Sequence, residues 1–258
     1  MCGKVIKESR SERLLGLTVK NDLSWSDHLY GNGLSGNDKT IGLLSQLSQR
    51  IGILKKLKPF TKPKQFNSIS NGIFTSKMTY GIQVFGNVWG LRSLDDGTRR
   101  HHSFTKEDNR RLQVLQNKVL RLKTGLGWET PTNLLMNEGK VLSDQQLTAY
   151  HTLTTVFKAV RLGKPLYLAN KFKLRRPNRF DIFPHRQTNI INIKADLTLS
   201  RGGMVYRGAK LWNMLDQDLK NEEKLKTSKR RLRNGSDKMS QSNLLEANNL
   251  SGGNFDYM

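Results

Sequence analysis

The apolar residues of the chain recur mostly at helical spacing. A helix is predicted over about 39–57, where residues three and four positions apart form one apolar face of Leu44, Leu47, Ile51 and Leu54. Lys55, Lys56 and Lys58 follow at its end, where cations suit the helix dipole, and Pro59 stops it. A second helix is predicted over about 64–80. Its apolar stripe consists of Phe66, Ile69, Ile73 and Tyr80, with Phe74 and Met78 lying off it.

The same spacing continues downstream. A helix over about 106–123 is predicted by a core face of Leu112, Leu115, Val119 and Leu122, and Gly125 supplies its stop signal. Another helix begins at Ser143, which forms a capping box with Gln146 and precedes a buried face of Tyr150, Leu153, Phe157 and Val160. A last helical stretch covers about 204–215, with 219–233 as a candidate continuation.

Alternation with period two is confined to short segments. Leu15, Leu17 and Val19 predict a short strand followed by a polar turn, and IINIKADLTL within 186–200 predicts a strand or small hairpin. From Gly235 onward Ser, Asn and Gly dominate, which predicts disorder. The expected fold is therefore mainly α: a helical bundle with a short N-terminal strand, a possible small β-hairpin and a disordered C-terminal tail.

The charge of the chain narrows the choice of partner. Lys and Arg number 44 against 21 Asp and Glu, a formal net charge of +23. Such a surplus repels itself unless nucleic acid or an anionic membrane surface offsets it. The N-terminus lacks the apolar core of a signal peptide, and no apolar stretch approaches the roughly 20 residues that span a bilayer. With Cys2 as the only cysteine, we expect an intracellular protein, nuclear or cytoplasmic, that binds nucleic acid and no membrane.

Two basic clusters are candidate phosphate contacts. On the helix at 106–123 the candidates share one outer face without visible acids, and they are Arg110, Arg111, Lys118 and Arg121. The alternative is an ordinary solvated face. In the second cluster, arginines for phosphates alternate with phenylalanines for base stacking, namely Arg175, Arg176, Arg179 and Arg186 with Phe172, Phe180 and Phe183. Equally, these phenylalanines could anchor a long loop to the core. A third basic run, KLKTSKRRLR at 224–233, suits a helix end or a nuclear-targeting patch.

Five segments, taken in order, resemble one family. They are LLGLTVKNDLSWSDHL at 14–29, RIGILKKLKPF at 50–60, FTSKMTYGIQVFG at 74–86, LQVLQNKVLRLKTG at 112–125 and VYRGAKLWNML at 205–215. Their order and spacing resemble the region after the palm of reverse transcriptases from non-LTR (LINE-type) retrotransposons, with jockey-like elements as the nearest group. No single motif is chemically unique, so the specificity lies in the order.

The resemblance implies a division of the chain and a function. Residues 1–38 would be a remnant of the post-palm strand and linker, 39–233 the helical thumb-like and C-terminal region, and 234–258 a disordered tail. The chain would bind RNA or an RNA–DNA duplex, and a palm domain of the parent polymerase is a further candidate partner. No small-molecule substrate is implied.

The departures from that family exclude its catalysis. Reverse transcriptases hold two metal ions with palm carboxylates, and neither the early palm strand nor the Y-x-D-D-type turn is present. Asp95-Asp96 is interpreted as a solvated turn, and His28 as a turn residue. The endonuclease is absent, one cysteine cannot build a Cys/His knuckle, and Asp216 stands where the family usually has proline. We therefore predict no catalytic residue, metal or cofactor here, with Mg²⁺ expected only for a full-length parent enzyme. The alternatives are a degenerate, non-functional remnant or a basic structural nucleic-acid-binding protein unrelated to polymerisation.

Overall fold

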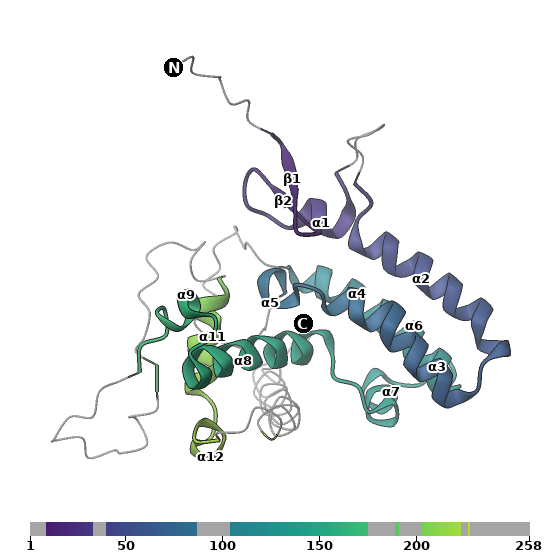
Figure 1. Ribbon diagram of the computed structural model, residues 1–258. Helices are drawn as coiled ribbons and strands as arrows, with labels where there is room; N and C mark the ends of the chain where they lie inside the picture. The colour runs from purple at the N-terminus through teal and green to yellow at the C-terminus, as the bar shows by residue number, and fades with distance from the viewer. Residues whose placement is uncertain are drawn as a thin grey trace, which may run out of the picture. The chain divides into compact units, whose positions relative to one another are not determined.

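A computed structural model of the protein describes residues 9–32, 40–86, 104–174, 189–190, 203–222 and 227 (Figure 1). The chain divides into two compact units. Unit 1 comprises Met1–Gly86 and His101–Asp144, and unit 2 comprises Asn87–Arg100 and Gln145–Met258. The boundaries expected near residues 38 and 233, the tail and most of the hairpin expected at 186–200 lie outside the described residues. Within the described part the fold is mainly helical with one two-stranded antiparallel sheet, which confirms the predicted class.

The N-terminal segment of unit 1 is a hairpin where the sequence predicted a single strand. Strand β1 (Ser11–Leu14) pairs with β2 (Leu17–Lys20), with Leu14 opposite Leu17. Leu15 and Gly16 form the loop with φ angles of 48° and 82°, the backbone of a tight two-residue turn that glycine favours. Leu15 is consequently 90% exposed rather than facing a core. The Tyr80 hydroxyl donates to the Leu15 carbonyl at 2.7 Å and ties the turn to the helices.

Helix α1 (Ser26–Tyr30) carries His28 into an aromatic cluster. The His28 ring lies 4.9 Å from the ring centroid of Phe85, which in turn lies 4.8 Å from that of Phe104. Nδ1 of His28 accepts the Thr18 backbone N–H at 3.4 Å. Burial, with smaller contributions from the charges of Lys77 and Arg13, lowers the pKa of His28 to about 4. His28 is therefore a neutral packing residue, and its interpretation as a turn residue was wrong.

The depressed pKa of His28 predicts a loss of stability in mild acid. The unfolded chain takes up a proton near pH 6.5, whereas the folded chain resists protonation until about pH 4. Stability is therefore complete above the unfolded pKa and falls as the pH drops through this window, by about 2 kcal/mol at about pH 5. Urea unfolding at several pH values should show this loss. In His28→Asn, whose amide oxygen can accept the Thr18 N–H without titrating, the loss should largely vanish; an unchanged pH profile would contradict the assignment.

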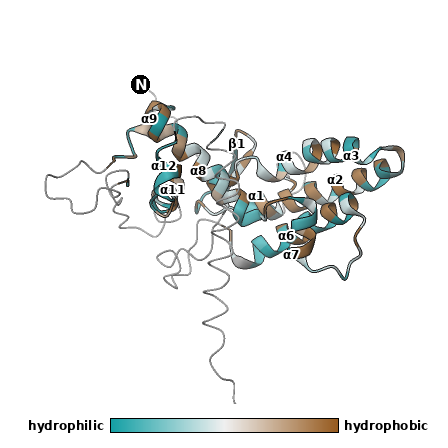
Figure 2. Cartoon of the chain, turned by 90° about the horizontal axis from the view of Figure 1, so that it is seen from below, coloured by the Kyte–Doolittle hydropathy of each residue, from teal (hydrophilic) through white to brown (hydrophobic). Residues whose placement is uncertain are grey.

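Two antiparallel helical segments follow the hairpin. The first is α2 (Leu43–Leu57), joined through the 3₁₀ turn η2 (Lys58–Phe60) to the second, which runs through α3 (Pro63–Ser70), the π-helical turn η3 (Asn71–Thr75) and α4 (Ser76–Thr79). The short helix α5 (Ile82–Phe85) ends this part. Figure 2 shows hydrophobic and hydrophilic residues interspersed along α2 and α3, as expected for helices with one buried side.

The buried faces of these helices differ in part from the predicted ones. Helix α2 buries Leu47, Ile51 and Leu54 as predicted, but Leu43 instead of Leu44. The second segment buries residues at a constant spacing of four, Phe66, Ser70, Phe74 and Met78, so the predicted stripe is wrong after Phe66. The π-helical turn explains the shift, because its wider turn keeps a spacing of four on one side of the helix.

Helix α6 (Lys106–Thr124) is the central helix of unit 1 and packs against α2, α3 and α7 (Thr132–Gly139). Gly125 ends it in the left-handed conformation, as the sequence predicted, and Thr105 and Asp108 form a capping box that was not predicted. Because it has neighbours on two sides, it buries polar residues too: Gln116 Nε2 donates to the Leu142 carbonyl at 2.7 Å, and Asn117 Nδ2 to Thr132 Oγ1 at 2.9 Å. Leu120 is buried, whereas Leu122, expected in the core, is only partly buried.

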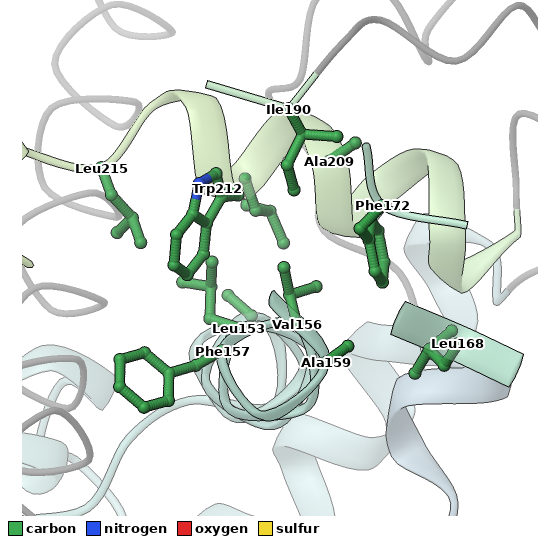
Figure 3. Close-up of a cluster of buried hydrophobic side chains, with 12 residues drawn as sticks. Leu153, Val156, Phe157, Ala159, Leu168, Phe172, Ile190, Ala209, Trp212 and Leu215 are labelled. Atoms are coloured by element: carbon green, nitrogen blue, oxygen red, sulfur yellow. The ribbon is translucent and has the colours of Figure 1, made fainter. Parts of the chain in front are cut away.

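Unit 2 has its own core between α8 (Asp144–Leu162) and α11 (Met204–Asn213), with α9 (Leu166–Ala169) and α12 (Gln217–Lys220) beside them. Figure 3 shows side chains of α8 and α11 facing one another, with the rings of Phe157 and Trp212 6.4 Å apart. Asn213 Oδ1 accepts the Ile190 backbone N–H at 2.8 Å, and Asn213 Nδ2 donates to the Ile190 carbonyl at 3.0 Å. Leu153 and Phe157 are buried as predicted; Tyr150 and Val160 are only partly buried.

None of the described helices combines the length and the apolar content that crossing a membrane requires.

Candidate nucleic-acid interface

All four basic residues predicted on the helix at 106–123 lie on α6. Arg110, Arg111 and Lys118 are exposed, and Arg121 is partly buried. The helix therefore brings them together along one element, but their hydrogen bonds give them different roles.

Arg110 and Arg111 share one acidic partner, Glu107. Arg110 Nε and one of its terminal nitrogens donate to the two Glu107 oxygens at 2.7 and 2.8 Å, and Arg111 Nε donates at 3.0 Å. These hydrogen bonds hold the pKa of the Glu107 carboxyl at about 2. The expectation that this face carries no acid was therefore wrong, because Glu107 lies one helical turn before both arginines.

The Tyr30 side chain adds further contacts at the start of α6. Its hydroxyl donates to the Asp108 carboxylate, and the Arg111 guanidinium lies 5.3 Å from the centroid of its ring. Burial, reinforced by the hydrogen bond to Asp108, raises the pKa of Tyr30 to about 12. A phosphate approaching Arg111 would therefore compete with Glu107 and with the Tyr30 ring. Both Arg–Glu pairs are exposed and of the kind that contributes little to stability, so a stronger anion can replace the carboxylate.

Arg121 organises the loop that follows α6. Its Nε donates to the Gly127 carbonyl at 3.1 Å, and one terminal nitrogen donates to the carbonyls of Trp128 and Thr130 at 3.0 and 3.3 Å. These bonds tie the loop to the last turn of α6, so Arg121 is a positioning residue here. Lys118 has no ion-pair partner among the described residues.

Most of the second basic cluster lies outside the described residues. Arg175, Arg176, Arg179 and Arg186 lie outside them, as do Phe180 and Phe183. Phe172 is described, and it is buried in the core of unit 2 with Leu168 and Ile190. For this residue the anchoring role holds, and base stacking is excluded. Of the basic run at 224–233, only Thr227 is described.

A further basic surface lies at the turn that follows α2. We call it the lysine tip: the turn between α2 and α3 with its five exposed lysines, Lys55, Lys56, Lys58, Lys62 and Lys64. The Thr61 hydroxyl donates to the Leu57 carbonyl at 3.1 Å, and the Lys62 N–H donates to Gln65 Oε1 at 3.3 Å. Pro59 lies in η2 and Pro63 begins α3, so the turn is restrained on both sides.

The lysine tip has no acidic counterpart nearby in the chain. No Asp or Glu occurs between Asp38 and Asp95. None of the five lysines forms an ion pair with another described residue. Surfaces normally mix charges of both signs, so a compact turn with one sign only is typical of a phosphate-binding surface. The sequence feature that indicates the lysine tip is this long stretch without acidic residues, and not the pattern on the face of any single helix.

No group of three or more His, Cys, Asp or Glu side chains able to hold a metal ion occurs in the described part of the chain. Comparisons of the chain with models of protein families, with curated proteins and with solved structures find no match.

Proposed function

We propose that the protein binds nucleic acid through phosphate contacts, as the thumb-like C-terminal portion of a non-LTR retrotransposon reverse transcriptase. The observation that carries the proposal is the lysine tip: five exposed lysines on one restrained turn, in a stretch of sequence without acids. RNA and RNA–DNA duplexes are recognised mainly through backbone and shape, so lysines suffice without base-specific contacts.

Binding of this kind needs no chemical step. Each lysine ammonium is a compact point charge that neutralises one phosphate and releases its condensed counterions. Lys118 adds a further free cation on α6, and Arg110 and Arg111 add theirs when a phosphate displaces Glu107. In this proposal the chain supplies no carboxylate pair of the palm type, and catalysis belongs to a palm domain of the parent polymerase.

The family assignment rests on the order of the five sequence segments and is a proposal of its own. Three of them, RIGILKKLKPF, FTSKMTYGIQVFG and LQVLQNKVLRLKTG, fall on α2, on the segment from η3 to α5 and on α6, all in unit 1. A thumb-like role would explain why a helical unit presents its charge on an exposed turn.

The proposal predicts a steep salt dependence of binding. The purified chain should bind an RNA–DNA duplex with an affinity that falls linearly on a log–log plot against salt, by roughly 0.7–0.9 per phosphate contact. Five to eight contacts would therefore give a slope of about 4–7. Fluorescence anisotropy of a labelled duplex at several salt concentrations measures it. A slope near or below about one would contradict the proposal, since it would leave the lysine tip without phosphates to neutralise.

A further inference from the structure

We infer that the lysine tip takes an unpaired nucleotide, with Phe60 as the ring on which its base stacks. The inference rests on the proposed function and deepens it. It adds a partner class, single-stranded RNA or DNA, to the duplex that lysines alone would accept.

Phe60 is placed unlike any other described phenylalanine. Its side chain is 86% exposed, whereas the six others, Phe66, Phe74, Phe85, Phe104, Phe157 and Phe172, are buried. Exposing a phenylalanine forgoes about 1.5–3 kcal/mol of burial free energy. Its exposure leaves the ring of Phe60 open to a ligand, on the turn that also carries the exposed lysines.

The backbone of the turn that carries Phe60 is restrained. Phe60 ends η2 directly after Pro59, and Pro63 begins α3 three residues later. Thr61 closes the turn, with its hydroxyl on the Leu57 carbonyl and its N–H on the Lys58 carbonyl at 3.3 Å. A backbone restrained in this way loses little conformational entropy when a ligand binds, which favours stacking over loose contact.

Phe60 lies between two exposed lysines of the turn. Lys58 precedes the ring by two residues and Lys62 follows it by two, and both are exposed. A cationic surface that tracks the backbone, combined with an aromatic ring for the base, is how single strands are bound without sequence preference. A closed duplex offers its bases to no such ring, because they are already stacked on one another.

An anionic membrane is the other partner that lysines beside an aromatic ring can suit. Membrane binding of this type scales with the apolar area that enters the interface. Here one ring is surrounded by lysines, while the nearby Leu57 and Thr61 are partly buried. A single ring suffices for one base, which favours nucleic acid.

The test compares Phe60→Leu, which keeps apolar bulk but removes the ring, with the wild-type chain. Binding to an unstructured oligouridylate should weaken by about 5- to 150-fold. Binding to a long RNA–DNA duplex should stay within about twofold, and the salt slope on both ligands should not change, since no charge is lost. Phe60→Trp should restore binding, and its additional fluorescence should be quenched by the oligouridylate. Tyr167→Leu, at an aromatic residue of unit 2 that is 74% exposed, is the matched control and should leave both affinities unchanged.

The outcomes separate the inference from the proposed function. If Phe60→Leu leaves oligouridylate binding unchanged, or weakens both ligands equally, stacking is refuted while salt-dependent binding stands. If the substitution weakens binding only to phosphatidylserine vesicles, the tip is a membrane contact instead. If the wild-type chain binds neither nucleic acid, the proposed function falls and the inference with it.

Discussion

Replacing four lysines of the lysine tip with glutamine is expected to weaken duplex binding more than any other surface change. The four are Lys55, Lys56, Lys58 and Lys64. If each holds one phosphate, the log–log salt slope should flatten by about three units, and affinity at about 0.1 M salt should fall on the order of a hundredfold to a thousandfold. Anisotropy titrations across a range of salt concentrations measure both quantities.

The control removes the same charge from another place. Unit 2 carries four exposed lysines without ion pairs among the described residues, Lys158, Lys164, Lys171 and Lys173. Changing these to glutamine lowers the net charge equally but should flatten the slope by less than about one unit. Equal effects of the two sets would mean that the chain binds as a diffuse polycation and that the lysine tip has no special role.

Loss of folding cannot imitate this result. All four tip lysines are exposed, and surface substitutions usually change stability by less than about 0.5 kcal/mol. Lys55 and Lys56 lie in the last turn of α2, where each interacts favourably with the helix dipole by about 0.3–1 kcal/mol. Removing crowded like charges offsets part of that cost. Urea unfolding of the variant should therefore give a midpoint close to that of the wild type.

The helices were predictable where spacing and stop signals agreed. Helix α6 was predicted almost to its ends, because its apolar residues repeat at three and four and Gly125 offers a left-handed cap. The second half of the α2–α4 hairpin kept its helical type, but its buried face shifted. The shift coincides with the π-helical turn η3, which also packs against α2, and the pattern of apolar residues gives no sign of that turn.

Two single residues were also misinterpreted from the sequence, one through a local turn and one through tertiary packing. Leu15 looked like a strand residue by alternation, but Gly16 allows the tight turn that exposes it. His28 looked like a polar turn residue, but burial beside the Phe85 ring lowers its pKa and keeps it neutral. The Leu15-Gly16 turn is local and is hidden by the alternation of apolar residues, whereas the environment of His28 comes from Phe85, which is far away in the sequence.

In the candidate site, the sequence could place the basic side chains on a helix face but could not predict their hydrogen-bond partners. A helical wheel places Arg110, Arg111 and Arg121 on the outside of α6, and it cannot say which partner each guanidinium takes. Two of them reach back to Glu107, and the third reaches forward to the carbonyls of the following loop. The lysine tip, by contrast, follows from sequence alone once acids are counted, because no partner of opposite sign is within reach along the chain.

The second large expected effect is a loss of stability at Gly42, where the start of α2 packs closely against the backbone of residues 29–31. Gly42→Ala should destabilise unit 1 by about 3 kcal/mol, at the upper end of overpacking, because the added methyl group meets backbone rather than flexible side chains. A Cβ there would lie 2.5 Å from both the Gly31 nitrogen and the Leu29 carbonyl oxygen, and closer still to the Tyr30 carbonyl carbon. The φ of Gly42 is −65°, so the cost is crowding and not backbone strain.

Gly52 offers the matched control on the same helix. It is exposed in the middle of α2, and a Cβ there would have no neighbour within 4 Å. Gly52→Ala should therefore stabilise by about 0.5–1 kcal/mol, as alanine does over glycine inside a helix. Urea unfolding followed by circular dichroism should move the two midpoints in opposite directions. Similar midpoints for both variants would show that the backbone at Gly42 is free to move away from α1.

Gly42→Ala also tests whether binding requires the folded turn or only the positive charge of the chain, because it leaves every lysine and arginine in place. Crowding at Gly42 pushes on Tyr30, whose hydroxyl binds Asp108 on α6 and whose ring lies beside Arg111. If the folded turn places its lysines and Phe60 together, the variant should lose oligouridylate affinity about tenfold or more at a temperature where wild type is folded and the variant is not. A polycation that binds without structure would keep its affinity there. Unchanged binding by the unfolded variant would therefore leave the charge of the chain as the whole explanation of its binding.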